Sequence, residues 1–234
     1  MMDFETWEPV YGAILRDFGY GRAGDERARD VLYELLADRE TLDPQDIDTD
    51  IEGVTVAVAG AGPSLESDLG VVRSADAVVA ASTAADRLLE RDVGVDCLVT
   101  DLDKHPETVV SLSREDVPVI VHAHGDNVGT VHEVVPRADA GAVVPTTQAA
   151  PRSPVRNFGG FTDGDRTAFL ADHLGAARLT FPGWDLDDPS VGPEKARKLR
   201  WAERLLYWLE RRRGERFSLL DGRRERIDTA HLPP

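Results

Sequence analysis

The spacing of apolar and polar positions divides the chain into an N-terminal helical part and a longer part with a different rhythm. In residues 25–42, apolar side chains recur at helical spacing and charged residues fill the other positions. The apolar stripe comprises Val31, Leu32, Leu35 and Leu36. We therefore predict an N-terminal helical segment over residues 1–50. Its end overlaps a predicted linker at residues 42–53, where a proline and an acidic run break the pattern.

From residue 54 onward, short apolar runs alternate with segments of helical pattern. Six of these runs predict β-strands, at residues 54–59, 76–81, 96–100, 117–123, 140–145 and 177–182. The runs are continuously apolar, which is typical of a sheet covered on both faces and hence mostly parallel. The predicted class is α/β, with a doubly wound, mostly parallel sheet in a domain over residues 51–214.

The C-terminal part is expected to be helical first and irregular afterwards. Residues 193–213 predict a long helix, which begins with a proline suited to a first turn. Its broad apolar face would pack either on the sheet or on a second subunit of a homo-oligomer. In the tail that follows, residues 215–234, the pair Asp221-Gly222 predicts a hairpin.

Composition narrows the range of partners. The 234 residues include 43 Asp and Glu against 27 Lys and Arg, which gives a net charge of −16. This charge argues against nucleic acid and against an anionic membrane surface, because both bind basic faces. Only three of the basic residues are lysine. An acidic excess with arginine far above lysine is typical of proteins from salt-loving microbes, where salt screens the self-repulsion.

The sequence also predicts a compartment. No apolar run approaches the roughly 20 residues that span a bilayer, and the N-terminus is acidic where a secretion signal would be basic. The single cysteine, Cys97, excludes an intramolecular disulfide and fits a reducing environment. We expect a soluble, cytoplasmic protein.

Candidate binding residues follow the first two predicted strands, since ligands of parallel sheets collect at the carboxyl ends of the strands. The turn after residues 54–59 offers two glycines, a proline and a serine: Gly60, Gly62, Pro63 and Ser64. Glycines there let the backbone approach a ligand, but they also serve in tight turns without one. After residues 76–81 come Ser82 and Thr83, which could cap a helix or bind a phosphate.

Two aspartates follow the third predicted strand. Residues two apart in an extended chain point to the same side, so Asp101 and Asp103 would face one cavity with Cα atoms about 7 Å apart. Carboxylates held together repel unless a cation lies between them, and Mg²⁺ is the natural cation for oxygen ligands and phosphates. In the alternative interpretation, Asp101 only caps the helix that begins at His105, and Asp103 is solvated.

The remaining candidates follow the later strands. After residues 117–123, Asp126 is expected to be a third acidic ligand or a helix cap, and the polar residues around it to bind substrate: His122, His124 and Asn127. Zinc is not expected there, because no cysteine or second histidine pair completes its shell. A Gly-rich turn and the last strand end add Asn157, Phe161, Asp163, Arg166 and Asp185. Arg166 could pair with Asp163 or with a phosphate.

These motifs resemble two enzyme families. Residues 80–104 resemble thiamine pyrophosphokinases through Ala85, Arg87 and Leu88 to the Asp-x-Asp of Asp101 and Asp103, with a departure at Ser82-Thr83. The motifs "GAGPSL", "VTDLD", "HAHGDN", "NFGGFTDGDR" and "GWD" together resemble the archaeal 6-hydroxymethyl-7,8-dihydropterin pyrophosphokinase family over most of residues 50–210. Relatives of that family include domains of motility-associated glycosyltransferases.

The second resemblance implies a reaction and a site. It implies transfer of a diphosphate from ATP to 6-hydroxymethyl-7,8-dihydropterin, with release of AMP, in folate or methanopterin synthesis. Asp101, Asp103 and Asp126 would hold Mg²⁺, with Asp126 as ligand or general base. The two turns at residues 60–64 and 82–83 would contact nucleotide or pterin, and the turn at residues 157–166 would line the opposite side, where Phe161 could stack on a flat ring.

Three other functions stay open at this stage. Thiamine could replace the pterin as the acceptor. A metal-dependent glycosyltransferase would also use Asp-x-Asp, although the chain offers no basic or apolar surface for a protein or membrane acceptor. A non-catalytic nucleotide-binding module would bind ATP without turnover.

Overall fold

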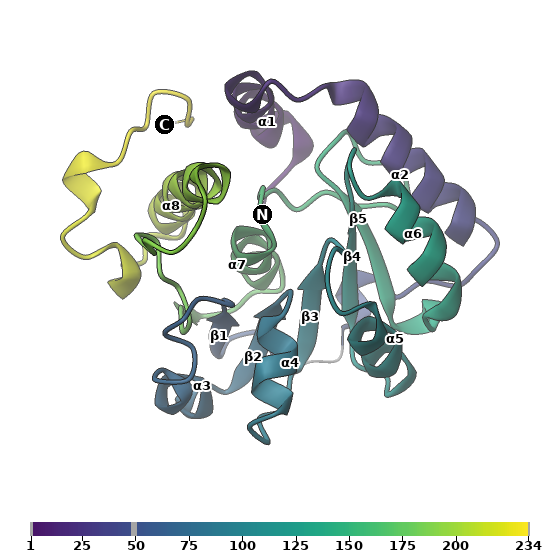
Figure 1. The fold of residues 1–234 in the computed structure, drawn as a ribbon, viewed down its shortest axis with the longest axis horizontal. Helices are drawn as coiled ribbons and strands as arrows, with labels where there is room; N and C mark the ends of the chain where they lie inside the picture. The colour runs from purple at the N-terminus through teal and green to yellow at the C-terminus, as the bar shows by residue number, and fades with distance from the viewer. Residues whose placement is uncertain (1, 48–50, 234) are drawn as a thin grey trace.

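The computed structural model describes residues 2–47 and 51–233, and a single sheet organises them (Figure 1). All of its strand pairings are parallel, in the order β5-β4-β3-β2-β1-β6. The strands are β1 Thr55–Ala59, β2 Ala77–Ala81, β3 Cys97–Thr100, β4 Val119–Ala123, β5 Val143–Thr147 and β6 Arg178–Thr180. The predicted α/β class and parallel sheet are therefore confirmed.

Five of the six predicted strands differ from the observed ones only at their ends. The fifth is displaced: residues 140–142 form a 3₁₀ turn, in which the Asp139 side chain accepts a hydrogen bond from the Gly141 amide at 3.0 Å. The strand then extends to Thr147. Pro145 is tolerated within it because β5 lies at the edge of the sheet.

Helices cover both faces of the sheet and create two separate cores. The helices are α1 Phe4–Phe18, α2 Arg22–Leu36, α3 Leu69–Ser74, α4 Ala84–Leu89, α5 Pro106–Arg114, α6 Val128–Val134, α7 Asp163–His173 and α8 Pro193–Arg213. α1, α7 and α8 pack on one face, which includes Val58, Val99 and Ile120. α2 to α6 pack on the other face, which includes Leu98 and Val121 (Figure 1). The sheet is doubly wound, as predicted.

The two N-terminal helices divide between these cores. The buried side chains of α1 join the core of α7 and α8, whereas those of α2 join the core beside β4 and β5. α2 turns one face inward, and its buried residues are Asp25, Ala28, Leu32 and Leu36. The predicted linker over residues 42–53 contains a short 3₁₀ turn at Pro44–Asp46. Residues 48–50 lie outside the described chain.

The long C-terminal helix has the predicted bounds and packs within the chain. Its apolar residues, among them Trp201, Leu205 and Leu209, are buried in the core that α8 shares with α7 and α1. Its apolar face is therefore covered within the chain, mainly by α7, and a homo-oligomer stays a prediction.

The hairpin predicted about Asp221-Gly222 is wrong for the described tail. Two 3₁₀ turns, Ser218–Leu220 and Arg224–Arg226, occur there instead. Arg224 donates hydrogen bonds to Glu210 at 2.7 and 2.8 Å and to Asp221 at 2.7 Å, and the Phe217 amide donates to Glu210 at 2.6 Å. The tail therefore folds onto α8 and does not form the hairpin. Within residues 2–47 and 51–233, no helix is long and apolar enough to cross a membrane.

Candidate metal and phosphate site

Three potential ligands gather at the carboxyl ends of two neighbouring strands. Asp101 and Asp103 follow β3, and His124 follows β4. One ligand atom from each lies within 4.8 Å of the others. His124 Nε2 is 3.6 Å from the Asp101 carboxylate. We call Asp101, Asp103 and His124 the acidic cluster.

A turn, and not an extended chain, brings the two carboxylates together. Leu102 between them has a left-handed backbone (φ 67°) and a buried side chain in the core. Its amide donates to the Thr100 hydroxyl at 3.0 Å, and the Asp103 amide donates to Asp101 Oδ1 at 3.3 Å. The predicted convergence is present, although its geometric reason differs from the one expected. Asp101 does not cap the following helix, because α5 begins at Pro106 after the N-cap residue His105 and has no side-chain cap.

Charge separates the two aspartates. Burial opposes ionisation of Asp101, but contact with the His124 ring and the positive charge of Arg166 lower its pKa to about 2. Burial, and then the negative charge of Asp101, raise the pKa of Asp103. The opposed pKa shifts show that the two carboxylates repel each other, and a cation bound between them would relieve this repulsion.

Asn127 joins the two strand ends. Its amide nitrogen donates to the carbonyl oxygens of Asp101 at 2.6 Å and His122 at 2.8 Å, and its oxygen accepts from the His124 amide at 3.0 Å. The side chain is buried. Asn127 thus positions the acidic cluster instead of facing solvent, where a substrate would be.

Asp126 lies beside this cluster but is not one of the three. Its side chain is exposed, and its amide donates to His124 Nδ1 at 3.4 Å. α6 begins with Asn127 as its cap residue and receives no side-chain cap. Asp126 as a third ligand or base stays a prediction. Sequence reasoning placed His124 among the substrate-binding residues and missed it as a potential metal ligand. The His-x-His at the end of β4, next to β3, was the available signal.

The turn at the start of α7 lies beside the acidic cluster. Thr162 and Asp165 form a capping box that starts the helix. Arg166 donates to Asp163 Oδ1 at 3.0 Å, with side chains only 7% and 10% exposed. Burial, and then the negative charge of Asp101, raise the pKa of Asp163 to about 7 against the opposing charge of Arg166. This pair lies within electrostatic range of the acidic cluster.

Two other residues of this turn have structural partners. Asn157 donates to the Ala149 carbonyl at 2.8 Å and accepts from the Gly159 amide at 2.8 Å, which shapes the turn. Phe161 is buried in the core, with its ring centroid 5.2 Å from that of Phe18. Neither is brought into the acidic cluster.

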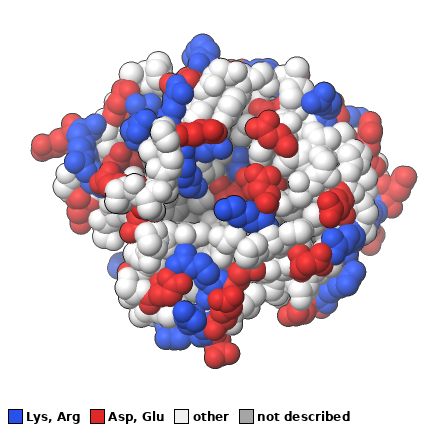
Figure 2. Space-filling view, viewed as in Figure 1, with Lys and Arg blue, Asp and Glu red and all other residues white. Residues whose placement is uncertain are grey.

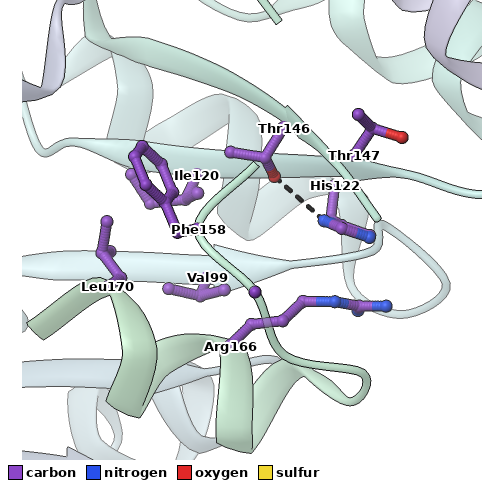
Figure 3. A pocket seen from close by; sticks show the side chains of 9 residues that line it. Val99, Ile120, His122, Thr146, Thr147, Phe158, Arg166 and Leu170 are labelled. Carbon is purple, nitrogen blue, oxygen red and sulfur yellow. Dashed lines mark hydrogen bonds between the residues drawn. The ribbon is translucent and has the colours of Figure 1, made fainter. Parts of the chain in front are cut away.

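A small cavity of about 10 Å³ lies behind His122, between the sheet and α7 (Figure 3). Its apolar end is formed by Val99, Ile120, Phe158 and Leu170, and its polar end by His122, Thr146 and Arg166. Thr146 donates to the Val121 carbonyl, so His122 Nδ1 must donate to the Thr146 hydroxyl at 3.0 Å. Burial, followed by the charges of Arg166 and His124, lowers the pKa of His122, and its ring is neutral.

The turn after β1 is braced by the loop after β6. The Ser64 amide and hydroxyl donate to Asp185 at 2.9 and 2.8 Å, and the Gly62 amide donates to the Gly183 carbonyl at 2.8 Å. A Cβ at Gly60 or Gly62 would lie 2.6 Å from the Gly183 oxygen. These glycines are required by backbone contact. Pro63 does not begin a helix, because α3 starts only at Leu69.

The turn after β2 contains Ser82 and Thr83, whose hydroxyls are candidates for binding a ligand. Ser82 has a left-handed backbone (φ 52°), and its amide donates to the Val99 carbonyl at 2.8 Å, which ties the turn to β3. Thr83 precedes α4 without capping it through its side chain. Both are half-buried. The face drawn in Figure 2 is hollowed near its centre, and acidic and basic side chains both line the hollow.

Comparison with known proteins places the chain in a family. Residues 35–190 match the family described as 6-hydroxymethylpterin diphosphokinase MptE-like. A curated 6-hydroxymethyl-7,8-dihydropterin pyrophosphokinase from Methanothermobacter thermautotrophicus is 39% identical over 227 residues, which span 90% of this chain and 96% of the relative.

Two further archaeal proteins with the same name are also similar. The one from Pyrococcus furiosus is 36% identical over 223 residues, spanning 89% of this chain and 95% of the relative. The one from Methanocaldococcus jannaschii is 31% identical over 232 residues, spanning 89% and 96%. The chain therefore belongs to the MptE-like 6-hydroxymethylpterin diphosphokinase family.

Proposed function

We propose that this protein transfers a diphosphate from ATP to the hydroxymethyl oxygen of 6-hydroxymethyl-7,8-dihydropterin and releases AMP. The observation that carries the proposal is the acidic cluster at the carboxyl ends of β3 and β4, in a chain that belongs to this family. The hydroxyl oxygen attacks the β-phosphorus, the bond from that phosphorus to the bridging oxygen of AMP breaks, and AMP leaves. The product belongs to folate or methanopterin synthesis.

The donor set fits Mg²⁺. Two carboxylates are the usual protein contribution to a magnesium site that also binds phosphates. Asp101 and Asp103 would hold the ion, and His124 orients the Asp101 carboxylate through its ring nitrogen. Bound there, the ion would neutralise phosphate charge and polarise the β-phosphoryl group.

The chain's own groups supply positioning and charge. Asn127 fixes the two strand ends, so the carboxylates keep their relative position during turnover. Arg166 is a buried cation near the acidic cluster, suited to the charge of a phosphoryl group in transit. We assign the hydroxyl proton to Asp126, which lies exposed beside His124, with a third-ligand role as the alternative for the same residue.

The half-buried turns and the exposed side of the cluster are assigned to the two substrates. Ser82 and Thr83 offer hydroxyls for a phosphate or for the pterin edge. The turn at Gly60–Ser64 presents its backbone on the same edge of the sheet. Both substrates are small, and we propose that they meet over the acidic cluster.

The test separates acceptor and mechanism. Purified protein in high salt receives Mg²⁺ and ATP with 6-hydroxymethyl-7,8-dihydropterin in one reaction and thiamine in another, and nucleotides are resolved as AMP or ADP. AMP formed with the pterin alone is the expected result. AMP formed with thiamine would keep the mechanism and change the acceptor. Folded protein that consumes no ATP in either reaction would overturn the proposal.

A further inference from the structure

A buried carboxylate in the N-terminal segment has no part in the site described so far. Asp25 lies in the first turn of α2, on the same buried face as Ala28 and Leu32, and is only 5% exposed. An acid on an apolar stripe is costly unless several donors satisfy it. We infer that Asp25, together with Gln148, is a positioning residue that orients Arg166 and the loop carrying His124. This inference rests on the proposed function only in assigning Arg166 to a phosphoryl group and His124 to the metal site.

Three donors converge on the Asp25 carboxylate. The Tyr11 hydroxyl donates to Oδ2 at 2.6 Å, the Gln148 amide nitrogen donates to Oδ2 at 2.9 Å, and the Gly125 backbone amide donates to Oδ1 at 2.8 Å. They come from α1, from the end of β5 and from the loop after β4. Asp25 therefore joins three segments that are far apart in the sequence.

The acceptor character of Asp25 fixes the direction of the next bond. A carboxylate only accepts, so Gln148 must turn its NH₂ group toward Asp25 and its carbonyl oxygen toward Arg166. That oxygen accepts from Arg166 Nη2 at 3.1 Å, while Arg166 Nη1 donates to Asp163 at 3.0 Å. Both terminal nitrogens of the guanidinium are held in this way. The orientation of Arg166 thus depends on a carboxylate in another helix.

The second branch leads to the acidic cluster. Gly125 follows His124 directly, and its backbone touches the start of α2, where a Cβ on Gly24 would lie 3.2 Å from Gly125 Cα. The hydrogen bond from Gly125 to Asp25 holds this close contact. His124, one residue away, lies 3.6 Å from Asp101. The Asp25 carboxylate thereby supports both Arg166 and the loop that carries His124.

The decisive variant keeps the shape of Asp25 and replaces Oδ2, the oxygen that accepts from both Tyr11 and Gln148. In Asp25→Asn the side-chain oxygen can still accept from Gly125, but an NH₂ group replaces the oxygen that accepted from Tyr11 and Gln148. The Tyr11 hydroxyl can turn to accept from this NH₂ group, whereas the Gln148 NH₂ group cannot, and if the Gln148 amide turns over, its NH₂ group faces the Arg166 guanidinium. We expect binding of α,β-methylene-ATP with Mg²⁺, and of Mn²⁺ alone, to weaken by about tenfold or more, since a hydrogen bond to a charged group is lost.

A compensating change tests whether the order of donors and acceptors from residue 25 through residue 148 to Arg166 matters. In the double variant Asp25→Asn with Gln148→Glu, the NH₂ group introduced at position 25 can donate to the carboxylate introduced at position 148, which still accepts from Arg166. The net charge is unchanged. We expect nucleotide and Mn²⁺ affinities to return to within about threefold of the wild type. A residue that only stabilised the fold would show its effect in the unfolding temperature and not in this reversal.

The control is a partly exposed aspartate of the same helix. Asp30 pairs with Arg29 and Arg152 at 3.0 and 3.2 Å, and its side chain is 40% exposed. Asp30→Asn should leave both affinities unchanged. If Asp25→Asn does not fold, Gln148→Met removes the acceptor of Arg166 without adding a charge, and the same loss of affinity is expected.

Calorimetry with α,β-methylene-ATP and Mn²⁺ measures binding without turnover, so the result stands even if the pterin reaction fails. Wild-type affinities in folded Asp25→Asn, or in Gln148→Met where that variant replaces it, would overturn the inference. Failure of Gln148→Glu to restore affinity in a folded double variant would also overturn it.

Discussion

At the scale of single residues, the acidic cluster gives two neighbouring aspartates opposite pKa shifts. Contact with His124 and the charge of Arg166 keep Asp101 ionised. Burial and the negative charge of Asp101 raise the pKa of Asp103. The neutral His122 behind them keeps a second positive charge away from the same space. The opposed pKa shifts of Asp101 and Asp103, more than the number of carboxylates in an acidic chain, make this place the candidate site.

The first prediction concerns the two aspartates. Asp101→Asn and Asp103→Asn should each reduce Mg²⁺-dependent AMP formation by at least about 100-fold, because each removes a charge that would hold the ion against the phosphates. The initial rate of AMP release, at saturating ATP and pterin, measures this loss, and circular dichroism checks the fold.

Asp38→Asn is the matched control, because Asp38 is exposed and lies outside the acidic cluster. Normal turnover in both Asp101→Asn and Asp103→Asn would return these residues to the general acidity of the surface. Normal turnover in Asp126→Asn would remove Asp126 alone from the proposed site.

A second residue-scale prediction concerns acid stability. Hydrogen bonds from Arg197 and then Trp201 lower the pKa of Asp17 to about 2, which links α1 to α8. A folded-state pKa below the unfolded value gives a stability contribution that is present above pH ~4 and lost as the pH falls toward 2. Asp17→Asn should lower the free energy of unfolding at pH 7 by up to about 1 kcal/mol, since the pair is partly exposed.

Urea unfolding at pH 7 and at pH 2.5 measures the difference between wild type and Asp17→Asn. The difference should shrink at the lower pH, because Asp17 is then protonated in the unfolded chain and partly protonated in the folded one. An equal difference at the two pH values would show that the Asp17 charge does not link α1 to α8.

At the scale of elements, loops from opposite ends of the chain brace one another at the edge of the sheet. Asp185, predicted to bind substrate, accepts two hydrogen bonds from Ser64, and the backbone of Gly183 lies against Gly60 and Gly62. Because β6 pairs with β1, the loop after the last strand supports the turn after the first. These contacts hold the turn in its shape.

Glycine substitutions test this brace. Gly62→Ala would place its Cβ 2.6 Å from the Gly183 oxygen and against the Asp185 carboxylate. The backbone must shift, so we expect a loss of about 1–3 kcal/mol in the free energy of unfolding. Gly70→Ala in α3 is the control, since its Cβ would meet nothing within 4 Å. It should be neutral or stabilising by about 0.5–1 kcal/mol. Urea unfolding compares both, and equal stability of the two variants would contradict the brace.

At the scale of the whole molecule, the dominant feature is charge. The net charge is −16. Arginines pair with some of the carboxylates, as Arg213 does with Asp172 and Glu215 at 2.7 and 2.8 Å, but carboxylates remain in excess. Unpaired carboxylates repel one another and destabilise a compact chain unless salt screens them. The excess acidity is thus a property of the surface as a whole and not of any one contact.

We expect the unfolding temperature to rise by several degrees, about 5–10 °C, between 0.1 M and 2 M KCl, as the Debye length falls from about 10 Å to a few Å. Thermal scans in KCl measure this rise. Sorbitol at equal osmolality is the control, because it does not screen charge. Full stability in 0.1 M KCl, with no rise on adding salt, would remove the salt-adapted interpretation of the composition.

The sequence by itself determined the element order, the parallel sheet and the long C-terminal helix, because local apolar periodicity and turn residues encode each of these over short distances. It also placed Asp101 and Asp103 at the end of a strand. The hairpin at Asp221-Gly222 failed because Glu210, in the preceding helix, captures the tail through Arg224 and Phe217.

Only the tertiary structure decided which strand ends meet and which way their side chains point. It brought His124 to Asp101, left Asp126 exposed beside them and turned Phe161 into the core. It also set Asp25 of the N-terminal helices against Gln148 and the loop after β4. These contacts join residues up to 123 positions apart, and such pairings follow from strand order and close packing, which no local pattern records.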